Sequence, residues 1–169
     1  MKHPKANRLS SYRAAVVEDG FRVELQKHIW QTDLEHVEVL SPRVDDSGYD
    51  LVLEAGGIMR HVQIKTMGNQ SSTSVFKVHT ELERKPAGCV IVIMCDDDTL
   101  AITKYLFFGS GPREALPSIQ DFKIAKHTKR DGNRVRAERP AIRDVRIAKF
   151  KIFATISELA VQLFGEQAA

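Results

Sequence analysis

The feature that most constrains the fold of this sequence is a continuous apolar run, CVIVIMC, at residues 89–95. It is strand-sized and rich in β-branched residues, and Pro86-Ala87-Gly88 and Asp96-Asp97-Asp98 mark its two ends. A strand without polar alternation has to be covered on both faces, as the central strands of α/β proteins are. We therefore expect a central buried strand with other elements packed above and below it.

The other patterns predict the order helix, strands, helix, strands, helix. Apolar residues recur every four positions from Val17 to Ile29 and predict a helix over residues 10–31. The remaining expected elements are strands at 37–40, 49–55, 58–66 and 100–108, a helix from about 75 to 85, a basic hairpin at 122–139, and a last helix to Phe164 capped by Thr155 or Ser157. This order predicts an α/β fold with a mixed central β-sheet flanked by helices.

The length of 169 residues suits one domain, and 43% hydrophobic and 28% charged residues are typical of a soluble globular protein. No apolar run approaches membrane-spanning length, and no apolar stretch follows the basic N-terminus as in a secretory signal. We expect a cytoplasmic protein that does not bind membranes. Cys89 and Cys95 are too far apart in one strand to bond to each other, so neither a disulfide nor a zinc site is expected.

The stretch GYDLVLEAGGIMRHVQIKT, residues 48–66, predicts a β-hairpin around Gly56-Gly57, because both glycines can adopt positive φ. In that register Asp50 faces Gln63 across the antiparallel pair. Side chains alternate along a strand, so Lys65 joins them on the same face while the apolar residues face the core. A one-residue slip would send these groups to the opposite face.

The grouped carboxylate, amide oxygen and ammonium suit a hard cation bound next to a phosphate. Mg²⁺ prefers oxygen ligands and is often held by only one or two carboxylates. Asp50, the side-chain oxygen of Gln63 and the backbone carbonyl of Ile64 are candidate ligands, and Lys65 can stabilise charge at a phosphate. The N-terminal helix offers a second carboxylate, since Glu18 and Glu24 flank its buried stripe about 60° to either side. The helical pattern leaves both open, with Glu18 slightly favoured.

An ordinary hairpin with a solvated polar face explains the same spacing without any metal. His61 lies on the face of Gln63 and suits a surface or supporting role. Asp96-Asp97-Asp98 lacks the glycine and the distal glutamate of a calcium loop and is interpreted as an acidic turn. The spacing alone favours the ordinary hairpin.

A glutamate-bearing helix, GYDLVLE, a short hairpin, VQIKT, a further helix and an apolar strand together resemble the PD-(D/E)xK nuclease superfamily. The resemblance covers about residues 12–108, and it is strongest to the branch in which Gln replaces the acid of the (D/E)xK triplet, as in some modification-dependent restriction endonucleases. It implies a restriction endonuclease-like fold, with residues 109–169 as a basic extension of the same domain.

Under this resemblance, Asp50 is the central metal ligand, Gln63 takes the second ligand position, Lys65 is the catalytic lysine, and Glu18 or Glu24 is the helix carboxylate. The implied activity is Mg²⁺- or Mn²⁺-dependent hydrolysis of DNA phosphodiester bonds. Two departures are visible. Gly48-Tyr49 stands where the superfamily often has Pro, and the uncharged Gln63 should bind a metal more weakly than Glu.

The distribution of charge fits a cation site beside a surface for a polyanion. Residues 14–66 contain ten acidic and five basic side chains, whereas residues 123–151 contain eleven basic and three acidic ones. Two solvated faces of opposite sign would give the same asymmetry. Backbone contacts to DNA are expected from the basic segment. The candidates are Lys126, Lys129, Arg130, Arg134, Arg136 and Arg139.

Three functions follow from these features. The main hypothesis is a divalent-metal-dependent endonuclease acting on DNA. The second is a catalytically weak or inactive nuclease-fold protein that binds nucleic acid or serves as an assembly module, which the uncharged Gln63 favours. The third is a protein-interaction domain whose last helix packs against a partner or a second copy, so a homodimer also remains open.

Overall fold

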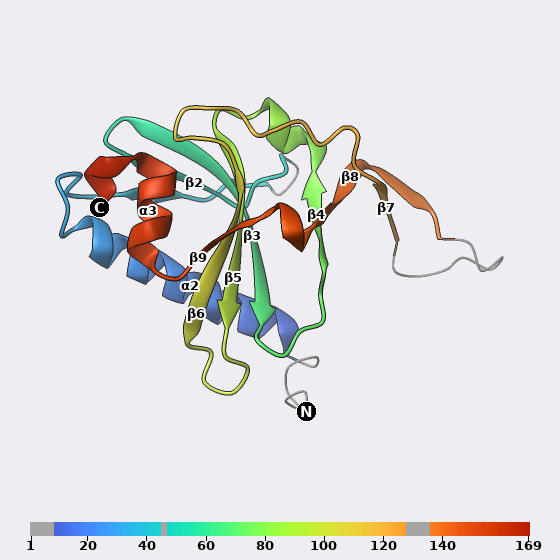
Figure 1. Ribbon diagram of the computed structural model, residues 1–169, viewed down its shortest axis with the longest axis horizontal. Helices are drawn as coiled ribbons and strands as arrows, with labels where there is room; N and C mark the ends of the chain where they lie inside the picture. Colours follow the sequence, from blue (N-terminus) through green and yellow to red (C-terminus); the bar gives the residue numbers. More distant parts are fainter. Residues whose placement is uncertain (1–8, 45–46, 128–135) are drawn as a thin grey trace.

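The structure is a computed structural model that describes residues 9–44, 47–127 and 136–169 (Figure 1). Its helices are α2 (Ser10–Ile29) and α3 (Ile156–Phe164), with the short 3-10 helices η1 (Thr80–Arg84), η2 (Ile147–Lys149) and η3 (Glu166–Ala168). Its strands are β1 (Glu38–Leu40), β2 (Leu51–Ala55), β3 (Ile58–Gly68), β4 (Val75–His79), β5 (Gly88–Cys95), β6 (Ile102–Gly109), β7 (Ile124–Lys126), β8 (Glu138–Arg146) and β9 (Lys151–Phe153).

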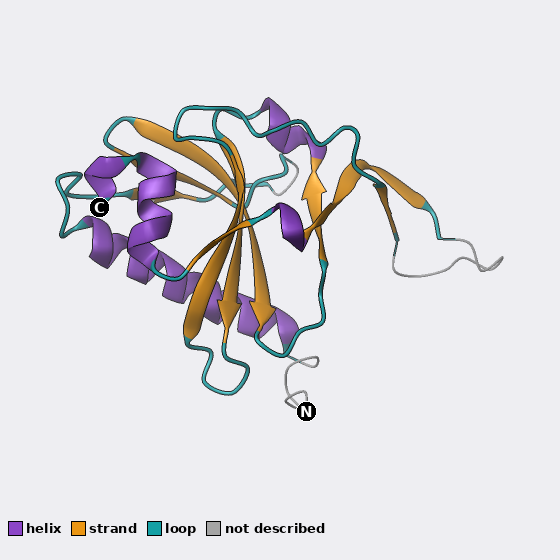
Figure 2. Cartoon of the chain, in the orientation of Figure 1, coloured by secondary structure: helices purple, strands orange, loops and turns teal. Residues whose placement is uncertain are grey.

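In the described chain the strands form a six-stranded mixed sheet and a three-stranded sheet (Figure 2). The larger sheet has the order β1-β2-β3-β5-β6-β9, in which only β3 and β5 pair in parallel. The smaller sheet has the order β4-β8-β7 and is antiparallel. The expected α/β class with a mixed central sheet is confirmed.

The larger sheet is the middle layer of three. Phe21 of α2 and Leu163 of α3 lie in one hydrophobic core with Leu53 of β2, so both helices cover the same face. Phe76 of β4 and Val145 of β8 form a second core with Val90 of β5, so the smaller sheet covers the opposite face. All eight residues of β5 are buried, which confirms the expected central strand covered on both faces.

The predicted helix at residues 75–85 is wrong, because the segment forms strand β4 followed by η1. Phe76 and Val78 are buried while Val75, Lys77 and His79 are half-buried, which is the alternation of a strand. The partner of β4 is β8, about 65 residues further along the chain, with Phe76 facing Val145. A partner so remote leaves no local signal in the sequence.

The C-terminal elements match the predictions in part. The basic segment does contain an antiparallel pair, β7 and β8, but β8 continues well beyond Arg139, and strand β9 was not predicted. Figure 1 shows β7 and β8 extending away from the larger sheet. Thr155 caps α3 in a capping box with Glu158, as one of the two expected caps. Leu159, Leu163 and Phe164 are buried in the core of the chain itself.

Two further expectations concern cysteines and membranes. Cys89 and Cys95 are free, buried thiols. Burial raises the pKa of both thiols above their ordinary value, so neither side chain resembles a reactive thiolate. Within the described residues, no helix combines the length and the apolar character needed to cross a membrane.

Candidate functional site

The candidate site lies at Asp50, directly before the first residue of β2, where β3 runs on beyond its pairing with β2. Leu51 pairs with Val62 and Ala55 pairs with Ile58, so the register expected from the Gly56-Gly57 turn is confirmed. β3 runs on to Gly68, paired with β5 on its other side. Among the described strands, none pairs with the β2 side of β3 beyond Val62. This leaves an open sheet edge directly next to Asp50.

Asp50 caps this open edge. Its backbone N–H donates to the carbonyl of Val62 at 2.8 Å, and its Oδ2 accepts from the N–H of Ile64 at 2.6 Å. The N–H and C=O of a strand residue point to the same side, so the Ile64 carbonyl also faces the edge where Asp50 lies. The geometry thus brings together two of the expected ligand groups.

Gln63 and Lys65 project from the same face of β3 into a hollow of about 310 Å³ beside Asp50. The larger part of this hollow's lining is polar or charged. Its lining residues are Gly48, Asp50, Gln63, Lys65, Lys77, His79, Arg139 and Ile142. The hairpin residues predicted from the sequence therefore meet in one cavity, together with residues of the smaller sheet.

The amide oxygen of Gln63 is the least satisfied polar atom of the hollow. Gln63 is only 8% exposed, and its Oε1 has no hydrogen-bond partner among the described residues. Leaving a buried acceptor unpaired costs about 1–3 kcal/mol. An oxygen in this state next to a carboxylate is suited to a ligand that the protein itself does not supply.

Glu18 is a helix carboxylate on which the charges of Asp50 and Lys65 act. Burial raises the pKa of the Glu18 carboxyl above its ordinary value, and the negative charge of Asp50 raises it further. Arg22 lies 3.8 Å from the Glu18 carboxylate and, like Lys65, lowers that pKa to a smaller extent. Two carboxylates that repel each other in a partly desolvated position are an arrangement that a bound cation would relieve.

Glu24 has a different place and a different partner. Its carboxylate accepts a hydrogen bond of 2.5 Å from the hydroxyl of Tyr105 on β6. Burial, followed by this contact, raises the pKa of the Tyr105 hydroxyl. Neither helix carboxylate is among the residues that line the hollow, and they differ in their partners: the charge of Asp50 acts on Glu18, whereas Glu24 is hydrogen-bonded to Tyr105. The structure thus separates the two helix carboxylates that the sequence left open.

The smaller sheet adds His79 and Lys77 to the hollow, and neither residue was expected there. The Nδ1 of His79 accepts from the N–H of Glu81 at 3.2 Å, so in the neutral ring the proton is on Nε2. Lys77 donates to the carbonyl of Lys126 at 2.8 Å. Because β4, the strand that carries them, was predicted as a helix, nothing in the sequence indicated that their side chains lie beside Asp50.

Gly48 explains one departure from the superfamily pattern. Its φ is +77°, a conformation that proline, fixed near −65°, cannot adopt. A Cβ at this position would lie 2.9 Å from the Cβ of His79. The chain therefore enters the Asp50 position by a route that requires glycine, closely packed against a residue of the site.

The oxygens of Asp50 and Gln63 in this hollow, together with the Glu18 carboxylate on α2, fit a weakly held hard cation. The oxygens of Asp50, Gln63 and Glu18 are of the kind that Mg²⁺ and Mn²⁺ accept, and the unpaired Gln63 Oε1 supports such a use. Within the described part of the chain, no group of three or more His, Cys, Asp or Glu side chains could hold a metal ion. An ion at this site would therefore depend on the neutral amide and on water for its remaining ligands.

The expected DNA-binding residues divide into three groups. Lys129, Arg130 and Arg134 lie outside the described residues. Arg139 lines the hollow beside Asp50. Lys126 and Arg136 line a neighbouring hollow of about 300 Å³ on the smaller sheet, and the other lining residues there are Val75, Lys77, Lys123, His127 and Asp144.

His61, which shares a face with Gln63, has a structural role. Its Nδ1 lies 2.8 Å from the carbonyl of Pro86, and its ring packs edge-on against Tyr49 at 4.9 Å between centroids. It is not among the lining residues of the hollow.

Comparisons with known proteins identify no family. No family model matches the chain, and no curated protein matches it. Among solved structures, the chain is similar to the bacterial homing endonuclease I-Ssp6803I, with a TM-score of 0.36 and 18% sequence identity over 64% of this chain and 67% of that one. A likeness of this strength carries no argument about fold or activity.

Proposed function

We propose that the protein is a divalent-metal-dependent endonuclease that hydrolyses DNA phosphodiester bonds at the hollow beside Asp50. The observation that carries the proposal is the buried, unpaired Oε1 of Gln63, which lines one cavity with Asp50 and Lys65. The motif order that resembles the PD-(D/E)xK superfamily gives the same three residues. Mg²⁺ or Mn²⁺ is the cofactor that their oxygens would accept.

The residues of the hollow divide the chemistry between them. Asp50, Gln63 and Glu18 would hold the ion, with the Ile64 carbonyl on the same edge. When bound, a divalent cation supplies an activated water and neutralises charge on the phosphate.

The cations of the hollow would contact the substrate. Lys65 would stabilise negative charge as it develops on the reacting phosphate, and Arg139 would help to position the DNA backbone. The Nε2–H of His79 is a donor that can bind a phosphate oxygen.

The test is cleavage of plasmid DNA with Mg²⁺ or Mn²⁺ by the full chain. Asp50→Asn retains an acceptor for the Ile64 N–H but removes the charge, and Lys65→Gln removes the cation without shortening the side chain severely. Both substitutions are expected to abolish cleavage at unchanged thermal stability. Asp98→Asn, in the exposed acidic turn, is the matched control and should cleave normally. Cleavage that survives both site substitutions would exclude this site.

A second function is favoured by one specific observation. The site offers no third acidic or histidine ligand among the described residues, so the fold could bind nucleic acid without cutting it. This alternative predicts salt-dependent DNA binding that is indifferent to Mg²⁺ and to Asp50→Asn. Binding titrations with and without the metal distinguish the two functions.

A further inference from the structure

The outer parts of β7 and β8 form a two-stranded ribbon that leaves the smaller sheet. Figure 1 shows it projecting beyond the rest of the described chain. Residues 128–135, which join its two strands, lie outside the described residues. The rows of the ribbon are Ala125–Arg139, Lys126–Glu138 and His127–Ala137, the last of them linked by a backbone hydrogen bond of 2.9 Å.

A bulge separates the ribbon from the body of the smaller sheet. Ile124 pairs with Arg143, whereas the next residue, Ala125, pairs with Arg139, so residues 140–142 are left without a partner on β7. The first of them is a proline, which lacks an N–H and is tolerated at bulges. Bulges bend a strand and change its direction, and they are frequent beside active sites. The bulge therefore directs the ribbon away from the sheet.

Two side chains hold the bulge in place. Arg143 donates to the carbonyl of Pro140 at 2.6 Å, and the hydroxyl of Thr80 donates to the carbonyl of Ala141 at 3.2 Å. These bonds tie the carbonyls of the bulge to the smaller sheet and to η1. The direction of the ribbon is thus set by the fold.

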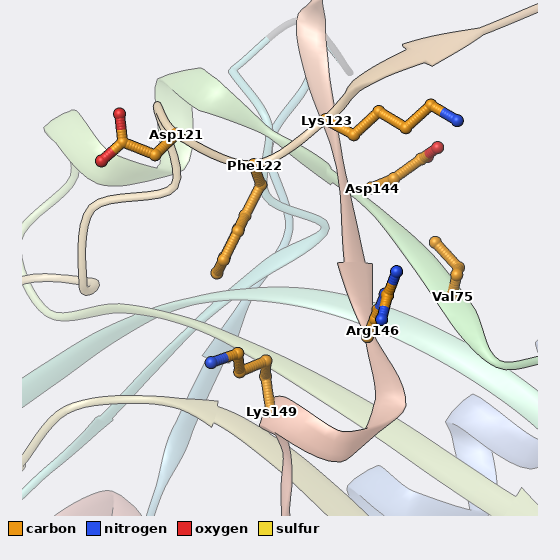
Figure 3. Close-up of a pocket in the computed structure, with 7 residues that line it drawn as sticks. All are labelled: Val75, Asp121, Phe122, Lys123, Asp144, Arg146 and Lys149. Carbon is orange, nitrogen blue, oxygen red and sulfur yellow. The ribbon is translucent and has the colours of Figure 1, made fainter.

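Phe122 anchors the chain that enters β7. Its ring packs on Phe108 of the core at 6.3 Å between ring centroids. Figure 3 shows this ring pointing away from Lys123 and Asp144, which extend to the other side from neighbouring segments. The base of the ribbon is therefore packed on the core through Phe122, while Lys123 faces outward.

Beyond this base the ribbon is exposed on all its residues. Residues 126, 127 and 136–141 are all exposed. A two-stranded ribbon is only marginally stable in water on its own, so packing within the chain does not account for its outer part. Lys126, His127 and Arg136 make it basic, and the one acid, Glu138, lies 4.0 Å from Lys126. Such a surface suits an anionic partner.

The shape of the ribbon selects the partner. Its strands lie about 4.8 Å apart, and its rows span about 7 Å along the strands. The major groove of B-DNA is about 12 Å wide and about 8.5 Å deep and admits a two-stranded ribbon, whereas the minor groove, about 6 Å wide, is too narrow for two strands with their side chains. The deep, narrow major groove of double-stranded RNA excludes such a ribbon as well.

Arg139 connects the ribbon with the hollow beside Asp50. It belongs to the row next to the bulge, and it lines the hollow together with Gln63 and Lys65. A phosphate at the hollow and a groove filled by the ribbon can therefore belong to the same duplex.

We propose that this ribbon enters the major groove of duplex DNA next to the phosphate that lies at the hollow beside Asp50. Lys126 and Arg136 contact the phosphates along the groove, and Arg139 contacts the backbone between the groove and the hollow. The proposal rests on the proposed function only in taking DNA as the ligand, and it names duplex DNA as the substrate class.

The test is fluorescence anisotropy of the full chain with a labelled DNA duplex of about 20 base pairs in EDTA, so that no cleavage occurs. A second duplex of the same sequence carries glucosylated 5-hydroxymethylcytosine, whose sugar fills the major groove. Arg136→Ala is expected to weaken binding of the plain duplex about fivefold and to lower the slope of its salt dependence by about one. The same variant should bind the glucosylated duplex as the unchanged protein does, because the ribbon cannot enter that groove.

Lys27→Ala removes an exposed cation from α2, on the opposite face of the larger sheet, and is the matched control. An equal effect of Arg136→Ala on both duplexes would overturn the proposal, since the ribbon would then lie outside the groove. Single-stranded DNA or double-stranded RNA bound as tightly as the plain duplex would overturn it as well. Plasmid cleavage with Mg²⁺ reads out the proposed function separately. Cleavage without groove-dependent binding would exclude this proposal alone, whereas groove-dependent binding without cleavage would support it in a non-catalytic protein.

Discussion

Two acidic regions of this molecule differ in how completely their polar groups are paired. In the turn after β5, Asp96 Oδ1 accepts from the N–H and the hydroxyl of Thr99 at 2.8 and 2.9 Å. Asp97 accepts from Arg13 at 3.1 Å and from the N–H of Gln70 at 3.0 Å. This turn has a protein donor for each of these carboxylates.

In the hollow beside Asp50 the pairing is incomplete, although Asp50 itself accepts from the N–H of Ile64 at 2.6 Å. Hydrogen bonds, first from the Thr99 N–H, lower the pKa of Asp96, whereas burial and the charge of Asp50 raise the pKa of Glu18. The buried oxygen of Gln63 has no donor among the described residues. Counting acidic residues therefore does not distinguish a structural cluster from a candidate site. What distinguishes them is whether each buried acceptor has a hydrogen-bond donor within the protein.

The largest expected contrast comes from removing one acid from each region. Asp50→Asn should lower the cleavage rate at least about 100-fold and leave the melting temperature unchanged. Asp97→Ala should retain cleavage but lose about 2 kcal/mol of stability, because Arg13 and Gln70 lose their partner. Cleavage assays and thermal unfolding of both variants measure this. If Asp97→Ala loses cleavage activity without losing stability, the turn after β5 is not purely structural and the assignment of the active site to the hollow beside Asp50 is contradicted.

His79 tests the contribution of the smaller sheet. His79→Asn can still accept from the Glu81 N–H but no longer reaches the position of Nε2, whereas His79→Gln can supply a donor near that position. We expect His79→Asn to lower kcat about tenfold at unchanged DNA affinity, and His79→Gln to recover most of the loss. If both variants are equally impaired, His79 supports the fold of η1 and has no contact with the substrate.

Glu18 and Glu24 allow a candidate metal ligand and a structural carboxylate to be compared within the single helix α2. Glu18→Gln should weaken Mn²⁺ binding roughly fivefold, without loss of thermal stability, because it removes a charge that repels Asp50. Glu24→Gln should lower the melting temperature by about 3 °C, because the Tyr105 hydroxyl loses a charged acceptor, and should leave Mn²⁺ binding unchanged. Mn²⁺ titration and thermal unfolding separate them. If Glu24→Gln weakens Mn²⁺ binding and Glu18→Gln does not, Glu24 is the metal ligand from α2.

The smallest effect concerns acid stability of the turn. Because the pKa of Asp96 is lowered in the folded chain from its ordinary value of 3.8, its stabilising contribution is present above that pH and is lost as the pH falls through the folded value. The melting temperature of Asp96→Asn should therefore lie below that of the unchanged protein at pH 7, and the difference should shrink below about pH 3.8. A difference that stays constant down to pH 2 would exclude this titration.

The sequence predicted what local interactions decide. The Gly56-Gly57 turn determines the register of β2 and β3, and so placed Asp50 correctly relative to Gln63. The spacing of Val75 and Val78 fits a helix as well as a strand, and only the distant partner β8 decides between them. His79 was missed for the same reason, since it belongs to no local motif. The unpaired oxygen of Gln63 depends on every neighbouring group and has no signature in the sequence.

The most direct test of the central claim is a crystal of the full chain soaked in Mn²⁺ and measured for anomalous scattering. We predict a peak in the hollow, in contact with Asp50 and the side-chain oxygen of Gln63, with Glu18 as the carboxylate from α2. A peak at the Asp96–Asp98 turn and none beside Asp50 would contradict it.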